Sequence, residues 1–348
     1  MAGGIGSRFW PSSREGMPKQ FLDILNIGKS LLVMTYERFS KICPEKNIFI
    51  VTNEKYRDII KEQIPTIEDN QILGEPYGKN TAPCIAYATY KIAQIDPDAN
   101  CIVAPSDHAI FNESEFENVI NKSIEFSGQG EKLVTIGITP HKPETGYGYI
   151  QYIDDSEVFK KVKTFTEKPN LDLAQKFLES GDFVWNAGIF IWNVKTIQSA
   201  FEKYLPDLSE IFSEINEFYN TDKEKQHVDI AYSQCKQVSI DYGIMEKASN
   251  VYVIPAEFGW SDLGSWASLH EISEKDENNN LIKANAITFE TKDCIIKASD
   301  KTLVVVEGLE GYLVVEHENA ILICKKDNER QFRQIYSEVK KKKGPEYL

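Results

Sequence analysis

A glycine-rich segment followed by two cationic residues opens the chain and constrains its fold more than any other stretch. Gly3, Gly4 and Gly6 permit a tight turn that brings backbone N–H groups close to a bound group. A run of such N–H groups forms a concave anion site, and Arg8 and Lys19 add positive charge nearby. A flexible terminus is the simpler alternative, but this spacing favours a loop that binds a triphosphate.

This loop differs from two well-known phosphate-binding motifs. No Gly-Lys-Ser/Thr follows it, as a Walker A loop requires, and the third glycine of the dinucleotide fingerprint is absent. A loop of this kind normally leaves the end of a strand, yet no strand precedes Met1. We therefore expect that the sequence begins at an internal methionine or has been trimmed.

The length and charge of the chain restrict its class and partners. Its 348 residues can form one large domain and a smaller one, and 42% hydrophobic with 26% charged residues is ordinary for a globular protein. The net charge of −14 predicts that neither nucleic acid nor an anionic membrane is a partner. A phosphate site therefore needs its own cationic groups or a metal.

The cysteines and histidines show no metal-binding or disulfide pattern. None of the six cysteines forms a C-x-x-C pair, and the five histidines lack metal-ligand spacing. No apolar run approaches the roughly 20 residues of a membrane span. We therefore expect buried reduced thiols and a cytoplasmic protein.

Short β-rich segments alternate with helical patterns through the first two-thirds of the chain. Predicted strands cover residues 48–52, 71–74, 100–104 and 132–137, and predicted helices cover 54–63, 81–95 and 113–126. The alternation predicts an α/β fold, a Rossmann-like domain with a mainly parallel sheet. Ligands of such sheets bind beyond the carboxyl ends of the strands, which makes residues 75–81 and 106–107 site candidates.

Three further regions follow this alternation. A β-rich insert with a helix at 172–179 covers about residues 146–192, and helices fill 195–247. A charged, turn-rich break at 276–280 is the predicted boundary between a domain of residues 1–280 and a small β domain of residues 281–348. Short β-runs in the second domain fit either a β-sandwich or a stacked β-helix, and a helix ends the chain.

Two aspartates are candidates for holding Mg²⁺, which prefers oxygen ligands and substrate phosphates. Asp107 follows a predicted buried strand, and capping of the next helix is its alternative role. Asp262 lies among two tryptophans and two glycines in residues 259–266, and a packed turn is equally compatible with that composition.

Polar residues elsewhere suit a nucleotide base and a sugar. Glu75, Asn80 and Thr81 follow a strand and could read a base edge, although a simple loop with Thr81 as helix N-cap is the alternative. A hexose needs hydrogen-bonding side chains and glycines where the backbone approaches. Candidates in the β-rich insert are Gly146, Glu167, Lys168 and Asn186, each of which could also be structural. Asp241 lies in a further segment, 239–247, whose role could be site-lining or structural.

The ordered set of motifs resembles the sugar-nucleotide pyrophosphorylases. Phe9-Trp10-Pro11 and Pro18-Lys19-Gln20-Phe21 narrow the resemblance to the mannose-1-phosphate guanylyltransferases. It covers nearly the whole chain, with Lys79 where Arg is more usual and Gly243 where Ala is common.

The resemblance implies a role for each candidate. It implies that Asp107 and Asp262 bind Mg²⁺ and that Arg8 and Lys19 neutralise the leaving diphosphate. The implied nucleotide-binding residues are Gly3, Gly4, Gly6, Glu75, Asn80 and Thr81. The implied sugar-1-phosphate residues are Gly146, Glu167, Lys168, Asn186 and Asp241.

The implied reaction transfers GMP from GTP to mannose 1-phosphate, giving GDP-mannose and diphosphate without a covalent intermediate. The attacking phosphate is already an anion, so no general base is required. The resemblance also implies a left-handed β-helix, of a kind often used in subunit contacts, and a homodimer.

Two alternatives stay open at this point. The chain could be another sugar-1-phosphate nucleotidyltransferase that uses glucose or a different base. It could also be a non-catalytic regulatory subunit that binds nucleotide sugars, but such a subunit is expected to lack Arg8, Lys19 or an aspartate, and all are present. We expect no mannose-6-phosphate isomerase domain, since little chain follows residue 280.

Overall fold

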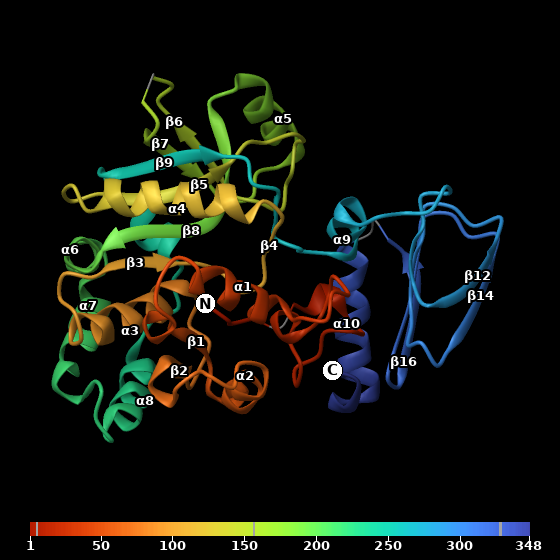
Figure 1. Cartoon of the computed structure of the whole chain (residues 1–348), viewed down its shortest axis with the longest axis horizontal. Helices are drawn as coiled ribbons and strands as arrows, with labels where there is room; N and C mark the ends of the chain where they lie inside the picture. Colours follow the sequence, from red (N-terminus) through yellow and green to blue (C-terminus); the bar gives the residue numbers. More distant parts are fainter. Residues whose placement is uncertain (5, 156, 327–328) are drawn as a thin grey trace. The chain divides into compact units, whose positions relative to one another are not determined.

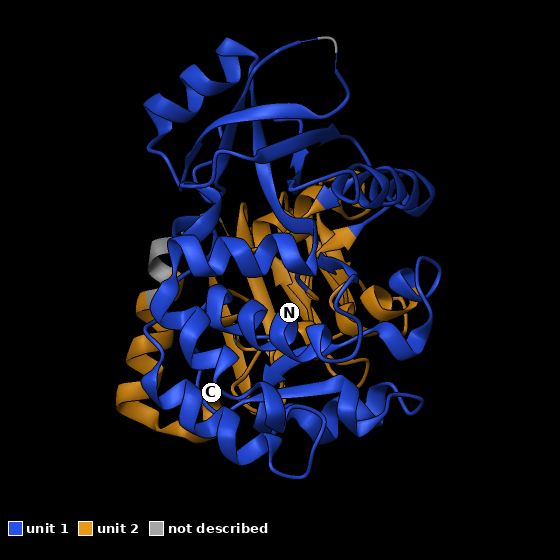
Figure 2. Cartoon of the chain, turned by 90° about the vertical axis from the view of Figure 1, so that its left-hand side faces the viewer, with its two compact units in different colours: residues 1–3, 38–105, 110–260 blue, residues 4–37, 106–109, 261–348 orange. Residues whose placement is uncertain are grey.

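A computed structural model describes residues 1–4, 6–155, 157–326 and 329–348 of the chain. By their contacts the residues form two compact units, coloured separately in Figure 2. Unit 1 contains residues 1–3, 38–105 and 110–260, and unit 2 contains residues 4–37, 106–109 and 261–348. Each unit therefore gathers segments that are far apart in the sequence.

Unit 1 is built on a six-stranded sheet with the order β3-β8-β5-β9-β7-β6. The strands are β3 (Asn100–Val103), β5 (Leu133–Ile138), β6 (Tyr149–Tyr152), β7 (Lys160–Thr166), β8 (Phe183–Asn193) and β9 (Val251–Ala256). Strand β8 is antiparallel to both β3 and β5, while β5 and β9 are parallel, so β3, β5 and β9 run in one direction. A separate parallel pair joins β1 (Ile50–Asn53) to β2 (Ile72–Glu75). The predicted α/β class is confirmed, and the antiparallel ladders come from β8 and the β-rich insert.

Helices cover both faces of this sheet. The helices of unit 1 are α2 (Arg57–Gln63), α3 (Thr81–Ala93), α4 (Glu113–Ser127), α5 (Leu171–Ser180), α6 (Val194–Tyr204), α7 (Pro206–Ser213) and α8 (Glu224–Gln234). Successive residues of a strand face opposite sides. Accordingly, Phe190 and Trp192 of β8 join a core with α3 and α6, whereas Ile189 and Ile191 join a core with α4. Figure 1 shows α4 lying along the sheet.

Unit 2 contains a small parallel β-helix. Its strands are β11 (Leu281–Lys283), β12 (Asn285–Phe289), β13 (Ile295–Lys297), β14 (Leu303–Glu307), β15 (Tyr312–His317) and β16 (Ala320–Lys325). Parallel ladders join β11 to β13, β13 to β15 and β12 to β14, while β16 turns back antiparallel to β15. Stacked parallel strands decide between the two expected architectures in favour of the β-helix.

The remainder of unit 2 packs around one apolar core. Helices α1 (Leu31–Ser40, whose last three residues belong to unit 1), α9 (Trp266–Ile272) and α10 (Glu329–Lys343) accompany the glycine loop. Phe9 packs on Trp266 with ring centroids 4.9 Å apart, and Phe332 of α10 joins the same core.

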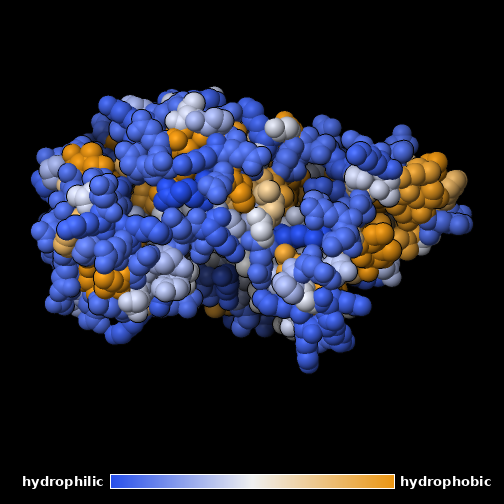
Figure 3. All heavy atoms as spheres, turned by 90° about the horizontal axis from the view of Figure 1, so that it is seen from below, coloured by the Kyte–Doolittle hydropathy of each residue, from blue (hydrophilic) through white to orange (hydrophobic). Residues whose placement is uncertain are grey.

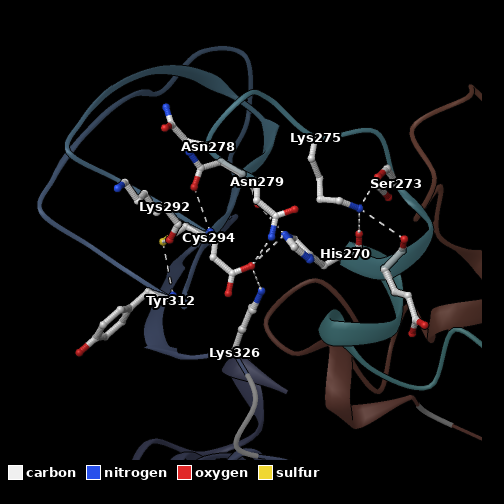
Figure 4. A network of polar contacts seen from close by, with 12 residues as sticks. His270, Ser273, Lys275, Asn278, Asn279, Lys292, Cys294, Tyr312 and Lys326 are labelled. Atoms are coloured by element: carbon white, nitrogen blue, oxygen red, sulfur yellow. Dashed lines mark hydrogen bonds and ion pairs between the residues drawn. The ribbon is translucent and has the colours of Figure 1, made fainter. Parts of the chain in front are cut away.

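The charged break after α9 is an ordered turn, shown in Figure 4. Lys275 donates hydrogen bonds to the carbonyl oxygens of His270 and Ser273, at 2.8 and 2.9 Å, at the carboxyl end of α9. Asp293 accepts hydrogen bonds from the side chains of Asn279 and Lys326. The turn is therefore fixed to both α9 and the β-helix. Its place as a domain boundary stays a prediction.

Two sequence expectations can be compared with this structure directly. Among the described residues, no helix has both the length and the apolar character needed to span a membrane. The six cysteines are free thiols, of which Cys84, Cys235 and Cys294 are buried as expected, whereas Cys43, Cys101 and Cys324 are only partly buried.

Candidate active site

The glycine loop has a backbone conformation that depends on its glycines. Gly4 and Gly6 have φ values of 100° and 67°, in the left-handed region that side chains rarely adopt. Gly6 also precedes the 3-10 turn Ser7–Phe9. A Cβ atom on Gly6 would lie only 2.4 Å from the Cβ of Lys19. The loop can therefore lie against Lys19 only because glycine occupies this position.

Lys19 is the centre of a polar cluster within unit 2. Its Nζ donates to Asp107 Oδ2 at 2.9 Å and to the backbone oxygen of Asp262 at 2.7 Å, and its side chain is only 5% exposed. Arg8 donates to the backbone oxygen of Gly264, at 3.4 Å, two residues beyond Asp262. The structure therefore brings the four predicted catalytic residues into one cluster.

The carboxylate of Asp107 is held in its charged form. Burial disfavours the charge, but Lys19 and His108 outweigh burial and hold the pKa of Asp107 below its usual value. The alternative role of Asp107 as a helix cap is wrong, because the cap of α4 is Asn112, whose side chain accepts the N–H of Glu115.

Asp262 belongs to a turn that is also tightly packed. Its Oδ1 accepts the N–H of Gly264 at 2.9 Å, and a Cβ on Gly264 would lie 2.5 Å from Asp262 Oδ2. The turn continues into Trp266, which is buried beneath Phe9. The packed turn predicted as an alternative is therefore present, and it fixes the carboxylate of Asp262 at the same time.

Asp107 and Asp262 are suitable as the ligands that a protein supplies to a bound Mg²⁺. In such sites one or two carboxylates commonly bind the ion together with substrate phosphates. Among the described residues, no group of three or more His, Cys, Asp or Glu side chains could hold a metal. Two carboxylates on their own suit an ion whose other ligands come from a substrate.

A cavity of about 560 Å³ in unit 1 gathers another part of the predicted site. Its lining residues are Asn80, Thr81, Glu167, Lys168, Ser239, Asp241 and Tyr242. This volume is typical of pockets for small ligands. Ser239 and Tyr242 were not predicted individually, although the segment 239–247 that contains them was.

The cavity carries adjacent carboxyl, amide and ammonium groups. Asn186 donates to Asp241 Oδ1 at 2.8 Å, and the Lys168 ammonium lies 2.9 Å from Glu167 Oε1. Burial raises the pKa of Asp241 and the charge of Glu167 raises it further, while the hydrogen bond from Asn186 opposes the shift. These groups suit a ligand that carries both hydroxyl groups and a negative charge.

A π-helical turn over Asp241–Met245 carries Asp241 and Tyr242 into the lining of the cavity. π-helical turns are rare in proteins, and those that do occur are often found at functional sites. Gly243 allows close packing there, because a Cβ at this position would lie 2.8 Å from Leu205 Cδ1. Tyr242 is 50% exposed.

Asn80 caps α3 and stands beside this turn. Its Oδ1 accepts the N–H of Thr81 at 2.8 Å, with φ of 71° at Asn80. The alternative in which Thr81 is the N-cap is therefore wrong. The Thr81 hydroxyl instead accepts the N–H of Ile240, at 2.8 Å.

Four predicted residues of unit 1 do not line the cavity: Asn186, which reaches it only through Asp241, and Gly3, Glu75 and Gly146. The N–H of Gly146 is bonded to Glu144 Oε1 at 2.9 Å, whereas a Cβ on Gly148 would lie 2.9 Å from Glu167 Oε2. Gly148 is therefore the glycine of this motif that approaches a cavity residue. Glu75 is buried and accepts the Tyr232 hydroxyl at 3.0 Å. Gly3 lies beside it, since a Cβ there would be 3.9 Å from Glu75 Oε2.

Comparison with known proteins identifies two family matches. The Nucleotidyl transferase family matches residues 1–279, and the MannoseP isomerase/GMP-like beta-helix domain matches residues 284–339. A mannose-1-phosphate guanylyltransferase of Klebsiella pneumoniae is 34% identical over 354 residues, covering 100% of this chain and 74% of the relative. One from Salmonella montevideo is 36% identical over 358 residues, with the same shares covered. A solved structure from Thermus thermophilus, described as a mannose-1-phosphate geranyltransferase, matches with a TM-score of 0.87 and 28% identity over 98% of both chains.

The buried carboxyl of Glu75 predicts a stability difference that depends on pH. Burial raises the pKa of Glu75 to about 7, against the opposing hydrogen bond from Tyr232. The folded state therefore holds this proton more tightly than the unfolded chain. The resulting stabilisation is complete below the ordinary pKa of 4.5 and is lost as the pH rises through about 7.

We expect Glu75→Gln to raise the free energy of unfolding at pH 8 by up to ~3 kcal/mol and to change it little at pH 4.5. Glutamine keeps an acceptor for Tyr232 and carries no charge. Urea unfolding at both pH values measures the difference, with the exposed Glu62→Gln as the matched control. An equal gain at both pH values would contradict the assignment.

Proposed function

The chain belongs to the Nucleotidyl transferase family, among the mannose-1-phosphate guanylyltransferases, and from this we propose that it transfers GMP from GTP to mannose 1-phosphate. The products are GDP-mannose and diphosphate. The observation that carries the proposal is the cluster of Arg8, Lys19, Asp107 and Asp262 next to the glycine loop. This combination of cations, carboxylates and turned backbone suits a polyphosphate.

The reaction needs alignment and charge neutralisation more than proton transfer. An oxygen of the sugar phosphate forms a bond to the α-phosphorus of GTP, and the bond from that phosphorus to the diphosphate oxygen breaks. The attacking oxygen is already anionic, so no side chain has to remove a proton. We assign the N–H groups of Gly3, Gly4 and Gly6 to the phosphates, and Arg8 and Lys19 to the charge of the departing diphosphate.

Asp107 and Asp262 would hold Mg²⁺ in this scheme. A bound Mg²⁺ supplies positive charge to the phosphate oxygens. The lowered pKa of Asp107 supports this role, because a carboxylate must be ionised to serve as a metal ligand. The same role for Asp262 is supported by the hydrogen bond from the N–H of Gly264, which fixes the orientation of its carboxylate.

The remaining residues divide between the sugar and the base. We assign Glu167, Asn186 and Asp241 to sugar hydroxyls, Lys168 to the sugar phosphate and the backbone of Gly146 to the sugar. The hydrogen bond from Asn186 to Asp241 and the pair of Glu167 with Lys168 support this division. Glu75, Asn80 and Thr81 are assigned to the nucleotide.

A diphosphate-release assay that crosses four nucleotides with two sugars tests the proposal. GTP, ATP, UTP and dTTP are each combined with mannose 1-phosphate and glucose 1-phosphate in the presence of Mg²⁺. We expect the highest kcat/KM for GTP with mannose 1-phosphate. A preference for another pair would favour a different sugar-1-phosphate nucleotidyltransferase, and no release with any pair would favour a non-catalytic binding subunit.

The charged cluster predicts a loss of rate on truncation. We expect Arg8→Ala and Asp107→Ala each to lower kcat by about 10²–10³, as removal of one preorganised charge-stabilising group typically does. Steady-state kinetics of diphosphate release measures the loss, and circular dichroism checks that each variant is folded. Lys29→Ala, which removes a cation paired with Glu37 in the same unit, should leave kcat unchanged. Near-normal turnover of either cluster variant would refute its assigned role.

We also propose that the chain forms a homodimer through an apolar face of the β-helix. Ile287 and Phe289 of β12 and Leu303 and Val305 of β14 are 49–58% exposed. Figure 3 shows hydrophobic side chains gathered at its right-hand end, where β12 and β14 lie in Figure 1. A second copy of the same face would cover these side chains, and two-fold symmetric contacts of this kind are the commonest in homo-oligomers.

A charge placed within this face should separate the subunits. We expect Val305→Asp to give a monomer in size-exclusion chromatography with light scattering, while the unmodified chain elutes as a dimer. Lys301→Glu also changes an exposed residue of the β-helix, lies outside the apolar face, and should leave the dimer intact. A monomeric unmodified chain, or a dimeric Val305→Asp variant, would exclude this interface.

We propose the cytoplasm as the location of the protein. The six free cysteines support this, since free thiols are typical of reducing compartments.

A further inference from the structure

Two segments of unit 1 that are about 160 residues apart in the sequence are joined by hydrogen bonds. Val238 donates to the backbone oxygen of Lys79 at 3.3 Å and accepts the N–H of Ala82 at 3.1 Å. The third bond runs from the N–H of Ile240 to Thr81 Oγ1, at 2.8 Å. The loop at the start of α3 and the segment that leads into Asp241 are therefore one rigid piece of the cavity wall.

The hydrogen bond from the N–H of Ile240 to Thr81 Oγ1 lies at the start of the π-helical turn. Ile240 is the N-cap of that turn, it is fully buried, and Asp241 follows it directly. The side chain of Asp241 is held separately, by Asn186 at 2.8 Å. Asp241 thus has two supports, Thr81 for the backbone on its N-terminal side and Asn186 for its carboxyl group.

We propose that Thr81 is a positioning residue for the sugar 1-phosphate, acting through the N–H of Ile240 to hold Asp241 in place. The proposal rests on the proposed function, because it names the sugar as the ligand of Asp241. It replaces the assignment of the Thr81 side chain to the nucleotide, since the hydroxyl accepts the N–H of Ile240. The two roles predict different outcomes: loss of the hydroxyl should raise the KM for the sugar phosphate in the new role, and the KM for GTP in the earlier one.

Valine and serine separate the two roles of the threonine side chain. Thr81→Val keeps the shape but removes the oxygen that accepts the N–H of Ile240, leaving a buried donor without its partner. Thr81→Ser keeps the oxygen and loses only a methyl group. An effect of the hydrogen bond should therefore appear in the valine variant and be absent from the serine variant.

We expect Thr81→Val to raise the KM for mannose 1-phosphate about tenfold, with kcat and the KM for GTP changed less than twofold. Thr81→Ser should stay within twofold of the unmodified enzyme in all three constants. Thr89→Val is the matched control, since it makes the same change at a buried position further along α3. A larger rise in the KM for GTP than for the sugar, or no rise in the sugar KM, would overturn the proposal.

A double-mutant cycle with Asp241→Asn tests whether Thr81 acts through Asp241. If it does, Thr81→Val should change the sugar KM less than twofold once Asp241 has been replaced. Effects that multiply in the double variant would overturn the proposal, since they mean that the two residues act independently. An unmodified chain that releases no diphosphate would refute the proposed function, whereas an active enzyme with an unaffected Thr81→Val variant refutes only this inference.

Discussion

The hydrogen bonds of the Lys19 ammonium are the interactions on which the arrangement of the charged cluster in unit 2 depends. One ammonium group bonds a side chain from residues 106–109 and a backbone oxygen from residues 261–348, so it joins all three segments of the unit. A buried ammonium is costly unless its hydrogen bonds are satisfied, and here its partners are a carboxylate and a carbonyl. The position of Lys19 also depends on the glycine loop, because a Cβ atom on Gly6 would collide with the Lys19 side chain.

Most strands in the first half of the chain could be predicted from local sequence patterns. One strand, β9, could not, and the reason is structural. The predicted strands at 48–52, 71–74, 100–104 and 132–137 correspond to β1, β2, β3 and β5 within a few residues. Strand β9 was not predicted, and its Pro255 is a residue that normally argues against a strand interior. The structure tolerates it because β9 pairs with β7 only at Tyr252 and Val253, so Pro255 has no ladder on that side. The length over which β9 pairs with β7 cannot be predicted from the residues of β9 alone.

The residue types of the site could be predicted from motifs, but their partners could not. Lys19 was assigned to a phosphate from its charge, and the sequence contains no sign that it would bond Asp107, which lies 88 residues away. Gly146 and Gly148 are equivalent in the sequence, and only the folded strands show that Gly148 approaches Glu167. Asn80 and Thr81 are both good caps, and the structure chooses Asn80, which leaves the hydroxyl of Thr81 for Ile240. Contacts between distant segments decide each of these cases.

The charges of the cluster make the proposed polyphosphate site compatible with a chain of net charge −14. The formal charges of Arg8, Lys19, Asp107 and Asp262 sum to zero, so the four side chains form a neutral group within an acidic protein. Such a group does not repel a phosphate, but it cannot by itself neutralise the roughly four negative charges of a nucleoside triphosphate. Two of the three N–H groups of the Lys19 ammonium are bonded to Asp107 and to the backbone of Asp262, so at most one is left for a phosphate oxygen. In the proposed reaction, the remaining negative charge of the nucleotide would be balanced by backbone N–H groups and by a cation such as Mg²⁺, and two carboxylates are the protein groups suited to hold such a cation.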